Sequence, residues 1–116
     1  MPLVNANTPP TATDDVHYVV YIASGDPPWC PDSRAALPVL KRVFSDASAP
    51  TAHIVRVGAR EEWKGKPDNK YRKAPYNIQG VPTVVKVKNG KELGRLDDKK
   101  SQNESDLRKL IGGEKQ

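Results

Sequence analysis

The feature that most constrains the fold is a continuous run of seven apolar and aromatic residues, from His17 to Ala23. A run with no polar alternation is typical of a strand that is buried on both faces, as at the centre of an α/β sheet. The run stops at residues 24–28, Ser-Gly-Asp-Pro-Pro, which form a cluster of turn-favouring residues. The sequence therefore predicts a central strand followed by a sharp change of direction.

A helix is predicted directly after this turn. Its apolar residues recur at spacings of four, three and four, at Ala36, Leu40, Val43 and Ala47. This spacing places them on one buried face of a helix. We expect the helix to begin at Cys30, with Pro31 in its first position, where the missing N–H of proline costs nothing.

The second half of the chain predicts further strands and a final helix. The strands are expected at Ala52 to Val57, Thr83 to Lys88 and Lys91 to Leu96. Asn89-Gly90 favours a type I′ hairpin turn, which needs positive φ at both central positions. Residues 101–104, Ser-Gln-Asn-Glu, resemble a capping box ahead of a short amphipathic helix. The polar stretch 59–80 is expected to hold short helical turns that Trp63, Tyr71 and Tyr76 anchor.

This order of elements defines the expected fold class. A strand–helix–strand crossover, an irregular insert and a strand–strand–helix unit predict an α/β protein with a four-stranded mixed sheet flanked by helices. We expect a flexible N-terminal arm at residues 1–15, one domain at 16–112 and a C-terminal tail at 113–116. A chain of 116 residues fits a single domain.

Composition narrows the partners and the compartment. The net charge of +5 is concentrated between Lys64 and Lys73, and no nucleic-acid-binding motif accompanies it, so we expect no nucleic-acid partner. The sequence contains no apolar run near the ~20 residues that span a bilayer, and its first 15 residues lack the pattern of a signal peptide. A single cysteine excludes a disulfide within the chain. We expect a cytoplasmic monomer without a membrane partner.

The only cysteine, Cys30, lies in the motif Trp29-Cys30-Pro31-Asp32-Ser33. Unpaired N–H groups and the helix dipole favour negative charge at the N-terminus of a helix, and the thiolate is the nucleophilic form of cysteine. Trp29 offers an apolar surface beside the sulfur. Asp32 has two interpretations: it accepts a proton near the sulfur, or it only stabilises the first helical turn.

A second motif, Gly80-Val81-Pro82-Thr83, directly precedes a predicted strand. We predict a cis Val81–Pro82 bond. This bond would expose the N–H and C=O groups of Val81 beside the sulfur of Cys30. An extended peptide could then pair with these groups as an added strand.

The two motifs and their order resemble the thioredoxin superfamily. Within it, the first motif is similar to the Trp-Cys-Pro-Asp-Cys sequence of the thioredoxin domain-containing protein 17 family, with Ser33 in the place of the second cysteine. The similarity continues at Val57-Gly58, Trp63-Lys64, Asn69, Tyr71-Arg72-Lys73, Asn77 and Val81-Pro82-Thr83. We expect the N-terminal strand and helix of this family to be lost or shortened here.

The resemblance implies a thioredoxin-like fold and a cytosolic thiol–disulfide oxidoreductase with no bound cofactor. Cys30 would be the nucleophile, and Ser33 occupies the position of the resolving cysteine. The residues implied in substrate binding are Trp29, Pro31, Val81, Pro82 and Thr83. The implied substrates are cystine, glutathione mixed disulfides, S-nitrosylated or persulfidated thiols and selected proteins. Electrons would come from thioredoxin reductase and NADPH, or from glutathione.

Ser33 leaves several interpretations open. In the first, Cys30 forms mixed disulfides that the chain cannot resolve. In the second, the chain is a native monothiol enzyme that depends on glutathione and either deglutathionylates its substrates or isomerises disulfides. In the third, it is a non-catalytic binding module. Serine is either native here or a replacement of cysteine, a change commonly made to trap mixed disulfides.

Three basic residues and two histidines have competing interpretations. Lys64, Arg72 and Lys73 either recruit an anionic substrate or form a solvated basic face. His17 and His53 lack a third ligand in the sequence, so we expect no metal site. An iron–sulfur cluster shared between two subunits is disfavoured, because the Pro-Asp pair after Cys30 crowds the loop.

Overall fold

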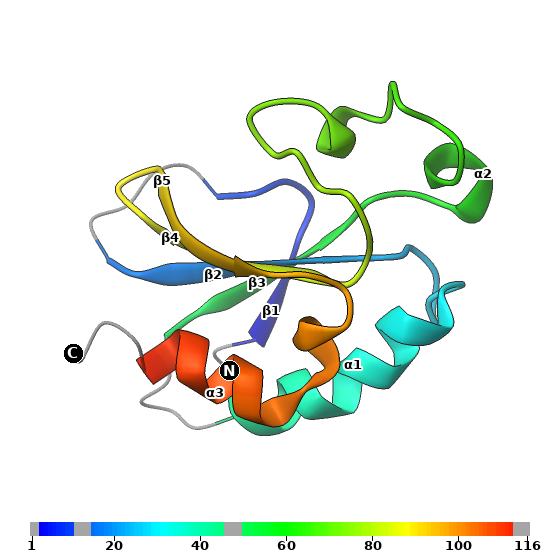
Figure 1. Ribbon diagram of the computed structural model, residues 1–116. Helices are drawn as coiled ribbons and strands as arrows, with labels where there is room; N and C mark the ends of the chain where they lie inside the picture. Colours follow the sequence, from blue (N-terminus) through cyan, green and yellow to red (C-terminus); the bar gives the residue numbers. More distant parts are fainter. Residues whose placement is uncertain (1–2, 11–14, 46–49, 113–116) are drawn as a thin grey trace.

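The computed structural model describes residues 3–10, 15–45 and 50–112, and its centre is a five-stranded sheet (Figure 1). The strands are β1 (Leu3–Ala6), β2 (His17–Ile22), β3 (Ala52–Arg56), β4 (Thr83–Lys88) and β5 (Lys91–Leu96). Their order in the sheet is β1-β3-β2-β4-β5. Strand β3 runs parallel to β1 and β2, whereas β4 runs antiparallel to β2 and β5. The predicted mixed α/β sheet is confirmed.

Strand β2 holds the centre of the sheet, as its apolar sequence predicts. All six of its residues are buried. Val20 is paired with Ile54 on one side and with Val84 on the other. The hairpin between β4 and β5 also turns where predicted, with positive φ at Asn89 (54°) and Gly90 (75°).

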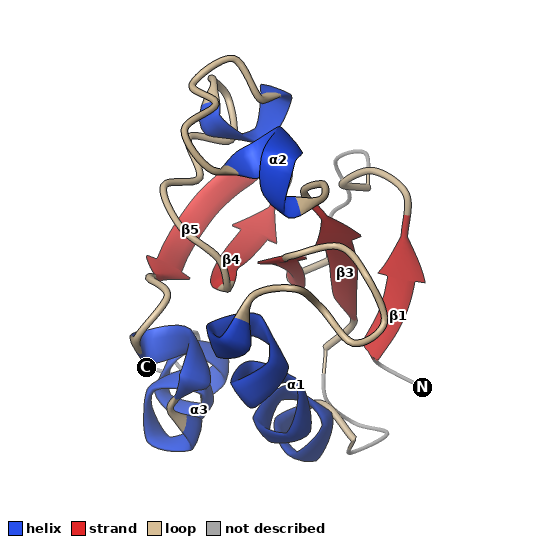
Figure 2. Cartoon of the chain, turned by 90° about the vertical axis from the view of Figure 1, so that its right-hand side faces the viewer, coloured by secondary structure: helices blue, strands red, loops and turns tan. Residues whose placement is uncertain are grey.

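Two helices cover one face of the sheet, α1 (Pro31–Val43) and α3 (Glu104–Gly112) (Figures 1 and 2). The predicted stripe Ala36, Leu40 and Val43 is buried, whereas Ala47 lies outside the described residues. These side chains share one apolar cluster with Tyr18, Val20, Ile22, Phe44, Val84 and Leu107. This cluster fixes α1 against β2, and so fixes the place where the helix begins.

The opposite face is covered by the insert, which contains the helix α2 (Arg60–Trp63) and the 3₁₀ turn η1 (Lys70–Arg72) (Figure 2). Trp63 and Tyr71 are buried and pack with Val19 and Val85 of the sheet. Tyr76 is half-buried against the same cluster. The predicted short turns and aromatic anchors are therefore present.

The sheet has one strand more than predicted. Leu3–Ala6 lie in the segment expected to be a flexible arm, but they pair in parallel with β3 from Ala52 to Val55. These four residues carry no periodic pattern, and the free edge of β3 supplies the hydrogen-bond partners. The predicted tail, residues 113–116, lies outside the described residues.

The predicted capping box before α3 is wrong by two residues. The side-chain oxygen of Asn103 accepts the N–H of Asp106 (3.0 Å) and so caps the helix. Ser101 lies in the 3₁₀ turn η2 (Lys100–Gln102), where its hydroxyl donates to the carbonyl of Leu96 (3.0 Å). No described helix is both long and apolar enough to cross a membrane.

Candidate functional site: the Cys30 thiol

Cys30 is the N-cap of α1, directly after the turn that follows β2. Its carbonyl accepts the N–H of Arg34 (3.0 Å), which is the first turn of the helix, and Pro31 follows in the first helical position. Cys30 is half-buried, and the helix begins where the sequence predicted. The thiol therefore lies at the N-terminal end of α1.

The Val81–Pro82 bond is cis, as predicted. The sulfur of Cys30 lies 3.7 Å from the carbonyl oxygen of Val81, to which the thiol donates. Pro82 is fully buried, and the hydroxyl of Thr83 donates to the carbonyl of Gly80 (2.6 Å). The two predicted motifs thus meet at one place. Two further cis bonds, Asp26–Pro27 and Ala74–Pro75, were not predicted.

Ser33 lies behind the cysteine, in the interior. Its side chain is fully buried, and its hydroxyl accepts the N–H of Ala23 (3.2 Å) at the end of β2. Position 33 is therefore shielded from solvent, whereas Cys30 is partly exposed to solvent. The structure gives Ser33 a structural contact that the sequence did not indicate.

Trp29 is held by a small network around Gly58. The indole N–H donates to the carbonyl of Gly58 (2.9 Å), and Ser24 both donates to and accepts from the backbone of Gly58 (3.1 and 2.9 Å). Gly58 has a φ of +129°, a conformation that side chains strongly disfavour. Sequence reasoning missed this network. Its signal was a glycine directly after a strand.

Pro31 and Asp32 are exposed on the first turn of α1. Within the described residues the Asp32 carboxylate forms no hydrogen bond, so its role as a proton acceptor stays a prediction. Arg34, in the same first turn, donates to the carbonyl of Pro28 (2.7 Å) and ties the helix to the loop that carries Trp29. This contact was also missed by sequence reasoning.

Arg72 is bound to its own fold. Its guanidinium lies 3.8 Å from the centre of the Trp63 ring and donates two bonds to the carbonyl of Trp63 (2.9 and 3.2 Å). A third bond reaches the carbonyl of Gln79 (3.2 Å). The structure therefore favours a structural role for Arg72, whereas Lys64 and Lys73 are exposed.

A second guanidinium holds the same segment from the other side. Arg95 of β5 donates to the carbonyls of Tyr76 (2.9 Å) and Asn77 (3.0 Å) and pairs with Glu92 through two bonds of 2.8 Å. Hydrogen bonding to Arg95 lowers the pKa of Glu92. Arg72 and Arg95 together hold three carbonyls in the four residues just before Gly80, and so fix the approach to Val81.

His17 and His53 lie edge to face, with ring centres 5.7 Å apart. Burial, and to a lesser extent the neighbouring His17, hold the pKa of His53 below its ordinary value. Within the described residues no three histidine, cysteine, aspartate or glutamate side chains gather in a way that could hold a metal ion.

The sheet order, the helix-capping cysteine and the adjoining cis-proline loop define a thioredoxin-fold domain. The fold matches thioredoxin of Malassezia sympodialis with a TM-score of 0.69 and 17% identity, covering 96% of this chain and 89% of that one. Thioredoxin of Fasciola hepatica matches with a TM-score of 0.62 and 24% identity, over 86% of this chain and 81% of that one.

Sequence comparison identifies the family. Residues 8–112 match the family model described as thioredoxin domain-containing protein 17-like, thioredoxin domain, and the chain belongs to this family. A thioredoxin domain-containing protein of Schizosaccharomyces pombe is 38% identical over 79 residues, 65% of this chain and 62% of that protein. The thioredoxin-like protein Clot of Oryza sativa is 34% identical over 82 residues, 66% of this chain and 58% of that protein. The matched region thus spans about three fifths of these relatives.

Proposed function

We propose that this chain is a cytoplasmic, monomeric thiol–disulfide oxidoreductase of the thioredoxin type that forms mixed disulfides through Cys30. The observation that carries the proposal is the place of the thiol. It is half-buried at a helix N-terminus, and its sulfur is 3.7 Å from the carbonyl of Val81. A helix N-terminus stabilises negative charge, and the backbone groups of Val81 lie beside the sulfur for a substrate to pair with.

The proposed step is one thiol–disulfide exchange. The Cys30 thiolate attacks one sulfur of a substrate disulfide, forms a new S–S bond with it and releases the other sulfur as a thiolate. Cystine, glutathione mixed disulfides and selected protein disulfides fit this chemistry. Trp29, Pro31 and the segment from Val81 to Thr83 would contact the substrate.

Ser33 limits the release of the bound substrate. A serine hydroxyl is scarcely ionised at neutral pH and forms no disulfide, so it cannot displace the substrate from Cys30. An external thiol such as glutathione has to do this. For a glutathionylated Cys30, glutathione thiolate attacks the glutathione sulfur, frees the Cys30 thiolate and leaves as glutathione disulfide. Thioredoxin reductase and NADPH would supply electrons only to a form with a second thiol.

The test is mass spectrometry after exposure to cystine or glutathione disulfide. The chain is expected to gain one half-cystine or one glutathione, and Cys30→Ser is expected to gain none. Addition of excess glutathione should remove the adduct slowly. The proposal would be refuted if the wild-type chain stays unmodified under conditions in which free glutathione exchanges with the same disulfide.

A non-catalytic binding module is the second candidate. The burial of Ser33 and its bond to Ala23 favour it, because they make position 33 a structural part of the fold. This candidate predicts that Cys30→Ser retains partner binding. The oxidoreductase predicts that the same variant loses every covalent adduct.

A further inference from the structure

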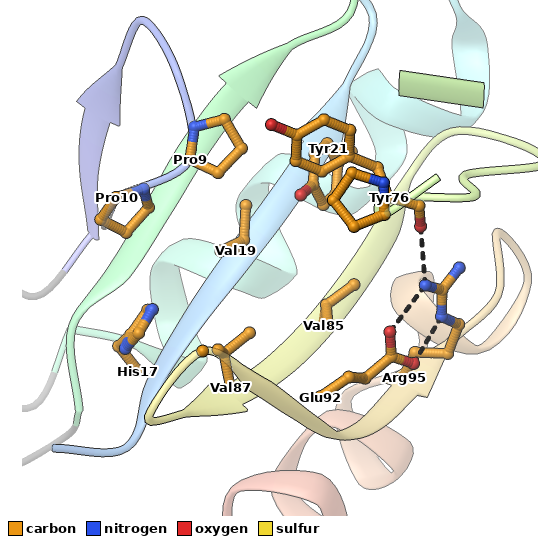
Figure 3. Close-up of a pocket in the computed structure, with 12 residues that line it drawn as sticks. Pro9, Pro10, His17, Val19, Tyr21, Tyr76, Val85, Val87, Glu92 and Arg95 are labelled. Carbon is orange, nitrogen blue, oxygen red and sulfur yellow. Dashed lines mark hydrogen bonds and ion pairs between the residues drawn. The ribbon is translucent and has the colours of Figure 1, made fainter. Parts of the chain in front are cut away.

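A cavity of about 160 Å³ lies on the sheet face opposite α1 and α3 (Figure 3). This face is covered at one edge by the loop with Pro9 and Pro10, and at the other by the insert with Tyr76. Within the described residues no helix packs over the middle of this face between the two covers. The strands β2, β4 and β5 therefore form the floor of a hollow that does not include Cys30.

The walls of the cavity are mainly apolar. They include Val19, Val85, Val87, Pro9 and Pro10. One ion pair lies at the cavity: Arg95 makes two bonds to Glu92 and two more to the carbonyls of Tyr76 and Asn77. The cavity therefore offers no unpaired charge to a ligand.

Besides the ion pair, the polar side chains that line this space are those of Tyr21, Tyr76 and His17. Tyr21 is 4% exposed, and its hydroxyl end points toward Pro9 across the cavity (Figure 3). Within the described residues this hydroxyl forms no hydrogen bond, although its ring packs near Tyr71 and Tyr76 (centres 5.7 and 6.4 Å apart). Burial raises the pKa of Tyr21, so the group stays protonated and able to donate.

A hydroxyl that forms no hydrogen bond within the protein is able to donate one to a ligand that occupies the cavity. A dry cavity of about 150 Å³ accommodates one benzene ring. The volume here is close to that size. The cavity is open to solvent at its rim, where the exposed residues are Pro75, Gly90 and Glu92.

We propose that this cavity binds a small neutral aromatic molecule of the size of phenol, with its ring against the valines and its polar atom hydrogen-bonded to the hydroxyl of Tyr21. The site is independent of the chemistry at Cys30. The apolar walls supply the affinity, and the hydroxyl of Tyr21 distinguishes rings that carry a polar group from those that do not.

The test compares phenol with toluene, which have nearly the same shape. Each is titrated into methyl-labelled protein while the methyl signals of Val19, Val85 and Val87 are followed by NMR. A purely apolar pocket prefers toluene, the more hydrophobic ring. One hydrogen bond is expected to make phenol bind about two- to tenfold more tightly than toluene.

Two tyrosine variants locate the hydrogen bond. Tyr21→Phe removes only this hydroxyl and is expected to make toluene the tighter ligand. Tyr18→Phe is the matched control, because Tyr18 lies on the opposite face against Phe44 (ring centres 5.5 Å apart). It should keep the preference for phenol.

A cavity-filling variant provides a second line of evidence. Val87 is half-buried at the cavity, so Val87→Phe is expected to place its own ring there and abolish binding of both compounds. The proposal is overturned if neither compound shifts the valine methyl signals up to its solubility limit. It is equally overturned if toluene binds wild type as tightly as phenol, or if Tyr21→Phe keeps the preference for phenol.

Discussion

The sulfur of Cys30 lies 3.7 Å from the carbonyl oxygen of Val81, a residue 51 positions further along the chain. The apolar packing of α1 on the sheet fixes the first of these residues. The guanidinium groups of Arg72 and Arg95 hold the backbone that leads to the second. The contact therefore depends on elements from both faces of the sheet.

Ser33→Ala is expected to destabilise the fold. The variant leaves the buried N–H of Ala23 without its acceptor, which costs about 1–3 kcal/mol. Urea unfolding measures the change. Ser45→Ala is the control: it removes an exposed hydroxyl that bonds to the carbonyl of Arg42, and should change stability by less than about 0.5 kcal/mol. Equal stability of both variants would contradict a structural role for Ser33.

Arg72→Ala is expected to lower the free energy of unfolding by about 1–3 kcal/mol, because it removes the stacking on Trp63 and the bonds to two carbonyls. Lys73→Ala changes an exposed neighbour and should have little effect on stability. If Arg72 instead recruits an anionic substrate, its removal would slow adduct formation with glutathione disulfide and leave unfolding unchanged.

The histidine pair predicts a loss of stability in mild acid. The pKa of His53 in the folded protein lies below the ordinary 6.5, so the unfolded chain takes up a proton at a higher pH than the folded one. The free energy of unfolding should therefore fall as the pH drops below about 6.5, until the folded-state pKa is passed.

His53→Gln is expected to flatten this dependence, as followed by urea unfolding at a series of pH values. The opposite result would be a free energy of unfolding that rises on acidification through the same range in both wild type and His53→Gln. That result would show that the pKa of His53 is not depressed.

The sequence predicted the elements that depend on local signals. Pro31 directly after Cys30 marked the start of α1, and Asn89-Gly90 marked the hairpin turn. The uninterrupted apolar run of β2 marked the centre of the sheet. These features follow from conformational preferences of a few neighbouring residues.

The missed features depend on partners far apart in the chain. Leu3–Ala6 form a strand only because β3 has a free edge, and Arg95 reaches carbonyls 18 and 19 positions before it. The bond between Ser33 and Ala23 likewise needs the turn between β2 and α1 to be closed. No periodicity or short motif records such contacts.

Ser33→Cys is expected to restore a second thiol at a buried position next to the nucleophile. Sulfur is a weaker acceptor than a hydroxyl oxygen, so the hydrogen bond from the N–H of Ala23 should weaken and the free energy of unfolding should fall. Under oxidising conditions the variant should form an internal disulfide between Cys30 and the introduced thiol, detected as a loss of two alkylatable thiols. Two free thiols after oxidation would mean that position 33 is out of reach of Cys30.

The most direct test of the account measures NADPH oxidation with thioredoxin reductase and cystine. The chain with Ser33 is expected to form its adduct and stop, with no sustained NADPH consumption, whereas Ser33→Cys is expected to turn over. Sustained turnover by the serine form, or adduct formation that persists in Cys30→Ser, would contradict the claim that Cys30 is the nucleophile and that position 33 limits its release.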